Sequence, residues 1–313
     1  MKRDEATDKL IVQLSKQLGI SMEAVETVIS SYKSHLLEHV NLQSRWSEQA
    51  EITMAGFEGV PIVRGLTLVY GNSDVGKTAL CCGIAQRCAT EGYTVAFLDS
   101  ELKMTKAVRK KALAGHRIAY AQEYIDSGLK EAIMTGLVNV LVVDSITALY
   151  ASAQLPFLKR VLSYVPYVIA TAQMRSDIRK GRLRLIPAVQ DEVAALVHTK
   201  LLLTEREQIA IEGDIVHRVQ YVVEKCVVPE VKRKSGSFII RKGTYDEVYT
   251  IYDKLRSSGK ITIQGHRKIL KAKSGDIILG KLSCLTNEVF NEMVATYKET
   301  RGEHGERHIE DSL

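Results

Sequence analysis

The motif G-x-x-x-x-G-K-T constrains the fold of this chain more than any other feature of its sequence. It occupies residues 71–78, directly after the apolar run Leu66–Tyr70 and directly before a helical pattern. Glycine lets the backbone wrap around a phosphate, and the N–H groups of the loop and of the next helix supply positive partial charge. The motif therefore predicts a nucleotide-binding strand–loop–helix unit; the alternative interpretation is an ordinary glycine turn.

The nucleotide contacts expected from this motif are spread over nine residues. Lys77 is expected to reach the β- and γ-phosphates, and the Thr78 hydroxyl to bind Mg²⁺. The full set is Gly71, Asn72, Ser73, Asp74, Val75, Gly76, Lys77, Thr78 and Ala79.

Short apolar runs alternate with helical patterns over the middle of the chain, which predicts a parallel sheet with helical crossovers. The predicted strands are Leu66–Tyr70, Thr94–Leu98, Val138–Val143 and Tyr167–Thr171. The predicted helices are Lys77–Glu91, Lys103–Ala114, Ser127–Gly136 and Leu155–Val165. Three consecutive strands, probable antiparallel partners by pattern, follow at Val197–Thr204, Ile215–Glu224 and Ser237–Arg241.

The flanks of this region predict further structural units. Residues 1–45 show two helical patterns and are interpreted as an oligomerisation segment, with an irregular linker after them. Residues 46–245 form the expected core, and residues 246–300 a small C-terminal domain with helices Asp246–Ser257 and Asn287–Thr300 and strands Lys260–Ile263 and Lys268–Leu270. Residues 301–313 are expected to be a flexible tail.

Composition excludes several classes of protein. With 45% hydrophobic and 26% charged residues, the chain is not intrinsically disordered. It has no apolar run long enough for a membrane helix, and its five cysteines suggest buried, reduced thiols. We therefore expect a cytoplasmic protein with no membrane partner. The net charge of +6 is compatible with a polyanionic partner.

Three polar residues follow predicted strands, where open α/β sheets bind ligands. Asp144 could hold Mg²⁺, or it could simply cap the next helix. Glu101 could deprotonate the attacking water, or it could be a first-turn helix acid. Gln173 could sense the γ-phosphate, or it could be an ordinary polar strand end. Spacing alone leaves these alternatives open.

Together these elements resemble the RecA family of DNA strand-exchange recombinases. Residues 66–78 match its phosphate loop, and residues 95–101, V-A-F-L-D-S-E, resemble its strand ending in the catalytic glutamate. Residues 140–149 are similar to its Walker B strand, and residues 169–175 to its strand ending in the nucleotide-sensing glutamine. Residues 222–229 are similar to a strand whose two lysines act on the neighbouring subunit; Lys225 matches one, and Val223 stands at the other.

The resemblance implies an α/β fold: a RecA-like P-loop ATPase core with a mostly parallel twisted sheet, a helical N-terminal segment and a small α+β C-terminal domain. It implies a DNA-dependent ATPase that uses ATP and Mg²⁺ and forms a helical homo-oligomeric filament on DNA, single-stranded and double-stranded. Glu101, Lys77, Gln173 and Lys225 would act in catalysis, and Thr78 and Asp144 would bind the metal.

The basic segment after Gln173 corresponds in the family to the second DNA-binding loop. Its cationic residues could neutralise DNA phosphates; the alternative is a solvated basic loop without a ligand. They are Arg175, Arg179, Lys180, Arg182 and Arg184. Basic clusters at residues 103–111 and 260–273 are interpreted as a solvated helix face and as a surface for duplex DNA.

The chain also departs from the family pattern. The first DNA-binding loop is reduced to about Tyr150–Leu155, Val108 stands near the position of an adenine-stacking tyrosine, and Asp74 adds a negative charge to the phosphate loop. Brevity and divergence favour a bacteriophage (UvsX-like) version in an infected host cell. Two other hypotheses stay open: a RecA-fold helicase or motor ATPase, and a regulatory paralogue that binds nucleotide without strand exchange.

Overall fold

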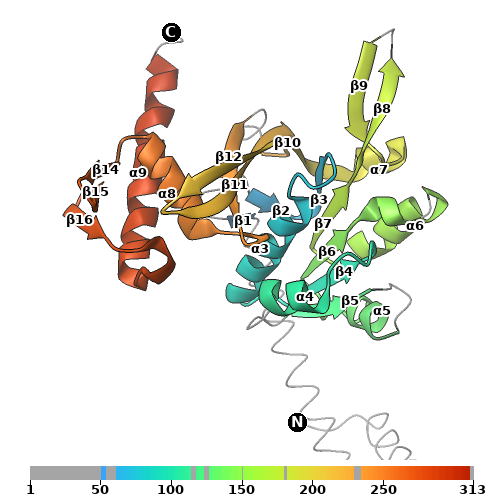
Figure 1. Ribbon diagram of the computed structural model, residues 1–313. Helices are drawn as coiled ribbons and strands as arrows, with labels where there is room; N and C mark the ends of the chain where they lie inside the picture. The colour runs from blue at the N-terminus through green and yellow to red at the C-terminus, as the bar shows by residue number, and fades with distance from the viewer. Residues whose placement is uncertain are drawn as a thin grey trace, which may run out of the picture. The chain divides into compact units, whose positions relative to one another are not determined.

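The computed structural model describes residues 51–53, 61–113, 118–122, 127–149, 151–179, 182–228 and 234–310. The chain divides into two compact units, residues 1–50 and residues 51–313. The predicted N-terminal helical segment lies outside the described residues. All that follows concerns the second unit (Figure 1).

A nine-stranded sheet forms the centre of this unit, with six neighbouring strands parallel and the remaining strands antiparallel. This confirms an α/β fold with a mostly parallel central sheet. The strands, in spatial order, are β13 (Thr244–Tyr245), β12 (Ser235–Arg241), β11 (Asp214–Lys225), β10 (Val197–Ile211), β3 (Gly65–Gly71), β7 (Tyr167–Ala172), β6 (Val140–Asp144), β4 (Val95–Asp99) and β5 (Ile118–Ala121).

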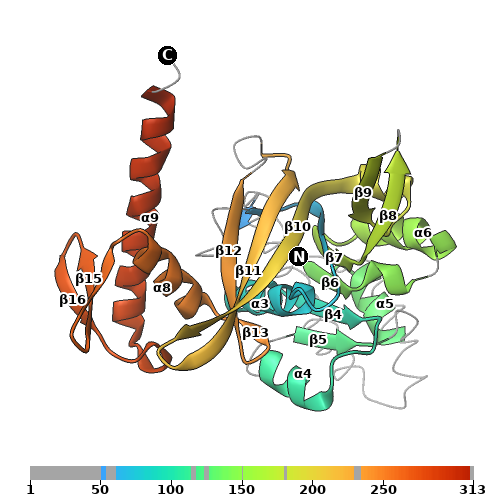
Figure 2. The same cartoon turned by 45° about the horizontal axis from the view of Figure 1, so that its top comes forward.

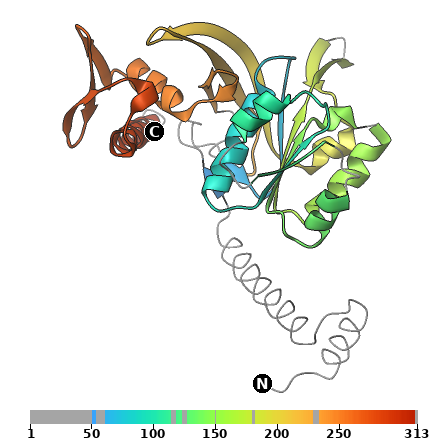
Figure 3. The same cartoon turned by 60° about the horizontal axis from the view of Figure 1, so that its bottom comes forward.

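Helices cover both faces of the sheet, as the parallel strands require. In Figure 3 the cyan and teal helices α3 and α4 lie on one side and the green helices α5 and α6 on the other. Leu129, Ile133, Leu158 and Val161 of α5 and α6 pack against sheet residues such as Leu68. The helices are α3 (Lys77–Thr90), α4 (Lys106–Ala112), α5 (Ser127–Met134), η1 (Ile146–Ala148), α6 (Ala151–Leu162) and α7 (Asp191–Leu196).

Residues 246–310, called the C-terminal subdomain below, pack around an apolar cluster that also includes Ile211, Val216 and Ile239 of the central sheet. The Asp246 side chain accepts a hydrogen bond from the Tyr249 N–H and begins the first helix. Buried Leu255, Leu270 and Met293 join three of its elements in one apolar cluster. The elements are α8 (Glu247–Ser257), β14 (Ile261–Gln264), β15 (Arg267–Ala272), β16 (Gly275–Leu279), η3 (Leu282–Cys284) and α9 (Asn287–Glu310).

The long β10–β11 ribbon reaches this subdomain at its far end, beside α8 (Figure 2). Arg218 on β11 donates two hydrogen bonds to the Asp253 carboxylate on α8, at 2.9 and 2.6 Å. Glu212, at the turn of the ribbon, forms an ion pair with Lys268 and accepts a hydrogen bond from the Leu282 N–H at 2.9 Å. The ribbon is therefore fixed to the subdomain by buried and half-buried charges.

Several expectations from sequence need correction. The helix α9 extends to Glu310, beyond the predicted end at Thr300. The predicted linker contains β1 (Glu51–Thr53), which pairs with β2 (Pro61–Val63). Cys284 is exposed, not buried as predicted; the other four free cysteines are buried.

The basic segment predicted as a loop is a hairpin of β8 (Met174–Arg179) and β9 (Arg182–Pro187), a separate two-stranded sheet in Figure 1. Residues 182–185, R-L-R-L, alternate polar and apolar side chains, which is the pattern typical of a strand. Across the described helices, none is long and apolar enough to span a membrane.

Candidate active site

The predicted phosphate loop joins β3 to α3, as its mechanism requires. Gly76 has φ +114° and ends the loop at the first turn of α3. A side chain at Gly71 would lie 2.5 Å from the Leu203 carbonyl oxygen on β10, so only glycine fits beside that strand. Asp74 also has a left-handed backbone, with φ +60°.

Lys77 lies folded back on this loop. Its Nζ donates hydrogen bonds to the carbonyl oxygens of Gly71 and Asn72, at 2.9 and 2.7 Å. Partial burial lowers the pKa of Lys77, although the charges of Asp144 and Glu101 act to raise it. The ammonium group is thus held inside the loop that would surround a phosphate.

The carboxyl ends of four parallel strands bring the other predicted residues to this loop. In register, Asp99 on β4 pairs with Asp144 on β6, and Ala172 on β7 pairs with Tyr70 on β3. Because the ends of parallel strands meet at one edge of the sheet, Glu101, Asp144 and Gln173 lie beside the phosphate loop.

Asp144 and Thr78 have the arrangement expected of a Mg²⁺ site. The Thr78 hydroxyl donates to one carboxylate oxygen of Asp144 at 2.6 Å, and the Thr171 hydroxyl donates to the other at 2.5 Å. Burial raises the pKa of Asp144, against the opposing effect of these two hydrogen bonds. A buried carboxylate beside a hydroxyl offers the oxygen ligands that Mg²⁺ prefers, so these residues fit the metal.

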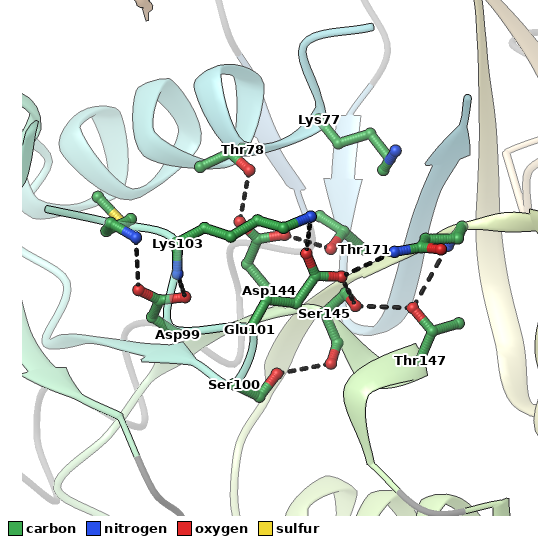
Figure 4. Close-up of polar contacts among 12 residues, drawn as sticks. Lys77, Thr78, Asp99, Ser100, Glu101, Lys103, Asp144, Ser145, Thr147 and Thr171 are labelled. Carbon is green, nitrogen blue, oxygen red and sulfur yellow. Dashed lines mark hydrogen bonds and ion pairs between the residues drawn. The ribbon is translucent and has the colours of Figure 1, made fainter. Parts of the chain in front are cut away.

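Glu101 lies in a polar network at the same edge (Figure 4). Its Oε1 accepts hydrogen bonds from the Ser145 hydroxyl at 2.5 Å and from the Gln173 amide at 3.4 Å. The Ser145 hydroxyl also contacts the Thr147 hydroxyl at 2.7 Å, which accepts from the Gln173 N–H at 3.4 Å. The residue expected to activate water and the residue expected to sense phosphate are therefore in contact.

Lys103 forms an ion pair with Oε2 of Glu101. Although partial burial alone raises the pKa of Glu101, hydrogen bonds from Lys103 and Ser145 and the Lys103 charge bring it below its usual value. The hydrogen bond to Glu101 raises the pKa of Lys103. Sequence patterns had placed Lys103 on a solvated helix face; instead it precedes α4 and reaches the site.

Glu101, Lys103, Asp144 and Gln173 line one open pocket together with the phosphate loop. Three lining residues were missed by sequence reasoning because they come from distant strands: Arg206 on β10, Ile240 on β12 and Gly243. A guanidinium N–H of Arg206 donates to the Asp74 carbonyl oxygen at 2.5 Å. The predicted lining residues are Ser73, Asp74, Gly76, Lys77, Thr78, Ala79, Glu101, Asp144 and Gln173. The loop residue Val75 is buried.

Lys225 ends β11 away from these residues. It pairs in register with Lys200, is exposed, and does not line the pocket within the described part of the chain. Any role in catalysis would therefore be exerted on another subunit.

The predicted DNA-binding residues follow Gln173 directly. Arg175 on β8 is exposed and donates to the Val189 carbonyl oxygen at 3.2 Å. The hairpin register pairs Arg179 with Arg182, and residue 177 with Arg184. Lys180 lies outside the described residues. The connection from η1 to α6 is a few residues long, in line with the shortened first DNA-binding loop.

Comparisons with known proteins were made for the whole chain, and no family model matches it. Over 105 residues the chain is 31% identical to the protein RecA of Oleidesulfovibrio alaskensis, covering 32% of this chain and 30% of that protein. Over 166 residues it is 27% identical to the DNA repair and recombination protein RadB of Methanococcoides burtonii, covering 44% of this chain and 71% of that protein.

Among solved structures, the chain is similar to the flagellar accessory protein FlaH of Methanocaldococcus jannaschii. The identity is 17%, the TM-score is 0.39, and the match covers 63% of this chain and 97% of that chain. The matched part spans less than a third of the RecA protein's length. The RecA and RadB similarities support a RecA-family relationship and a P-loop nucleoside triphosphatase.

Proposed function

We propose that this protein is a DNA-dependent ATPase of the recombinase type, which forms filaments on single-stranded DNA and promotes homologous pairing and strand exchange. One observation carries the proposal: Gln173 contacts Glu101 on one side and leads directly into the basic hairpin β8–β9 on the other. The similarity to RecA and to the repair and recombination protein RadB supports the ATPase part of this proposal.

The proposed ATP hydrolysis would use the residues that line the pocket. Lys77 and the N–H groups of the phosphate loop would bind the phosphates. Thr78 and Asp144 would hold Mg²⁺, which supplies charge neutralisation at the phosphates when bound. Glu101 would accept a proton from the water that attacks the γ-phosphorus, while the bond from that phosphorus to ADP breaks.

Coupling to DNA would run through Gln173. Its amide would exchange the hydrogen bond with Glu101 for one with the γ-phosphate, and this exchange would shift the hairpin that begins at Met174. The four arginines of the hairpin would bind DNA phosphates, so that binding weakens as salt concentration rises. Hydrolysis would then loosen the protein on DNA.

Assembly is a further part of the proposal. The exposed Lys225 would act on the nucleotide of a neighbouring subunit in a helical filament, and residues 1–45 would serve in oligomerisation. Within the RecA relationship, we propose a bacteriophage (UvsX-like) recombinase, because the first DNA-binding loop is reduced.

The first experiment measures ATP hydrolysis with and without single-stranded DNA, at low and high salt. Strong stimulation that fades with salt and disappears in Lys77→Ala would support the proposal. Alanine at Arg179, Lys180 and Arg182 should remove the DNA stimulation. Alanine at Lys106 and Lys110, a matched basic pair on α4, should leave it intact. DNA-independent turnover in the unaltered protein would contradict DNA dependence.

A second candidate function is that of a regulatory paralogue that binds nucleotide without strand exchange. The short connection between η1 and α6 favours it, because little chain is left there to contact DNA. In that case the hairpin substitutions would change neither turnover nor any DNA binding, whereas Lys77→Ala would still remove nucleotide binding.

A further inference from the structure

The segment from Asp99 to Met104 is held rigidly against the end of β6. The Ser100 N–H donates to the Asp144 carbonyl oxygen at 2.9 Å, and the Ser100 hydroxyl donates to the Ser145 carbonyl oxygen at 2.6 Å. The buried Asp99 carboxylate accepts the N–H groups of Lys103 and Met104 at 3.2 and 2.9 Å. Both ends of this short turn are therefore fixed.

The turn directs Lys103 into the site. Between Glu101 and Lys103 the backbone of Leu102 is left-handed, with φ +56°, while the next side chain, Met104, is buried. Lys103 lines the same pocket as Lys77, Thr78 and Asp144. Figure 4 shows its side chain extended across the site to Glu101, whereas the Lys77 side chain points away from Glu101.

The two oxygens of the Glu101 carboxylate have different partners. Oε1 accepts from Ser145 and Gln173, and Oε2 is paired with the Lys103 ammonium. Oε2 is therefore the oxygen left to accept a proton from water, and Lys103 covers it. A carboxylate oxygen bound to an ammonium is a poor proton acceptor.

The Lys103 end of this ion pair is open to solvent: its side chain is 62% exposed, against 13% for Glu101. Solvent at the ammonium group weakens the pair, so a stronger anion in the pocket can take the ammonium from the carboxylate. A triphosphate bound by the phosphate loop would be such an anion. Arg206, the other cation missed by sequence reasoning, instead contacts the loop at the Asp74 carbonyl.

We propose that Lys103 is a catalytic residue that changes partner when a triphosphate binds, leaving Oε2 of Glu101 for an oxygen of the γ-phosphate. This inference rests on the proposed ATP hydrolysis and deepens it. The exchange uncovers Glu101 for water and places a positive charge of the same chain at the reacting phosphate. Lys103 keeps its proton throughout; the proton of water goes to Glu101 as the water oxygen bonds to phosphorus and ADP departs.

The test compares Lys103→Gln, which removes the charge, with Lys103→Arg, which keeps it. Lys106→Gln is the matched control, since Lys106 is exposed, close in sequence and outside the pocket lining. Calorimetry measures the affinity for ADP and for a non-hydrolysable ATP analogue with Mg²⁺, and a phosphate-release assay gives kcat and KM.

Lys103→Gln should bind the ATP analogue about tenfold or more weakly, the effect of losing one charge-assisted hydrogen bond, with ADP affinity unchanged. The kcat of Lys103→Gln should fall at least as much. Lys103→Arg should recover most of the analogue affinity and most of the kcat, and Lys106→Gln should match the unaltered protein in both quantities. Equal loss of ADP and analogue affinity would overturn the proposal, as would a kcat that is unchanged or raised in Lys103→Gln.

The two proposals fail in different ways. If the unaltered protein binds the analogue and hydrolyses ATP while Lys103→Gln equals it in both, only the role of Lys103 is refuted. If the unaltered protein hydrolyses ATP no faster than the Lys77→Ala variant, the proposed ATPase function itself is refuted, and the role of Lys103 is refuted with it.

Discussion

Replacing Asp99 by asparagine should both destabilise the protein and slow hydrolysis. Asp99 is fully buried and accepts three hydrogen bonds, from the Lys103 and Met104 N–H groups and from the Tyr120 hydroxyl at 2.7 Å. These bonds hold the turn that carries Glu101 and Lys103. Asparagine keeps the shape of the side chain but not its charge.

The size of the effect can be worked from these contacts. If the asparagine oxygen faces Met104 and Tyr120, its amide faces the Lys103 N–H, donor against donor. Two charge-assisted bonds then become neutral, at about 1 kcal/mol each, and one buried N–H loses its acceptor, at about 1–3 kcal/mol. Relief of repulsion between Asp99 and Asp144 offsets a little of this. We expect a net loss of about 2–4 kcal/mol.

Urea unfolding followed by circular dichroism measures this loss, and Tyr120→Phe gives a graded comparison. Tyr120→Phe removes one of the three bonds, so it should cost about 1–2 kcal/mol. In Asp99→Asn, kcat should fall about tenfold or more because the catalytic groups are misplaced, while ADP still binds to the phosphate loop. An Asp99→Asn protein as stable as the unaltered one, or less affected than Tyr120→Phe, would refute the reasoning.

Three other predictions follow from single contacts. Gly76→Ala should weaken ATP binding by calorimetry about tenfold or more, because φ is +114° and a Cβ would lie 2.4 Å from the Ile240 side chain. Thr171→Val removes a buried donor to Asp144, so the Mg²⁺ concentration for half-maximal hydrolysis should rise about tenfold, and the free energy of unfolding should fall by about 1–2 kcal/mol. Asp214 accepts hydrogen bonds from Tyr249 and Arg241, which lower its pKa. Asp214 therefore contributes fully to the free energy of unfolding above about pH 4, the usual Asp pKa. This contribution is lost as the pH falls through the lowered pKa of Asp214 in the folded protein. Asp214→Asn should be less stable in urea at pH 7 and equally stable at the lowest pH at which both variants fold.

The parallel strands were predictable because they are buried on both faces. Runs such as Val140–Val143 contain only apolar residues, and in the structure every residue of β6 is buried. The edge strand β5 was not predicted, because it has only four residues, and two of them are alanine, which has a low preference for strands. The hairpin β8–β9 was not predicted, because β8 contains three consecutive polar residues, Arg175, Ser176 and Asp177, and only β9 alternates clearly.

The site was partly predictable for a related reason. Lys77, Thr78, Glu101, Asp144 and Gln173 all follow strands whose ends meet at one edge, so the order of elements was enough to bring them together. Arg206 belongs to a strand that passes the phosphate loop midway along its length, where no motif marks it. The position of Lys103 in the site could not be predicted, because it depends on the turn held by Asp99, a contact that sequence spacing does not reveal.

The β10–β11 ribbon connects the nucleotide pocket to the C-terminal subdomain and could act as a rigid arm between them. Arg206 of β10 contacts the phosphate loop, and Glu212, six residues further along the chain at the turn of the ribbon, is fixed to Lys268 of the C-terminal subdomain. At about 3.3 Å per residue the arm is about 20 Å long, so a tilt of about 10° at the loop would move its tip by about 3–4 Å. Closure of the loop on a phosphate would therefore move the basic cluster at residues 260–273, which takes no part in the proposed hydrolysis.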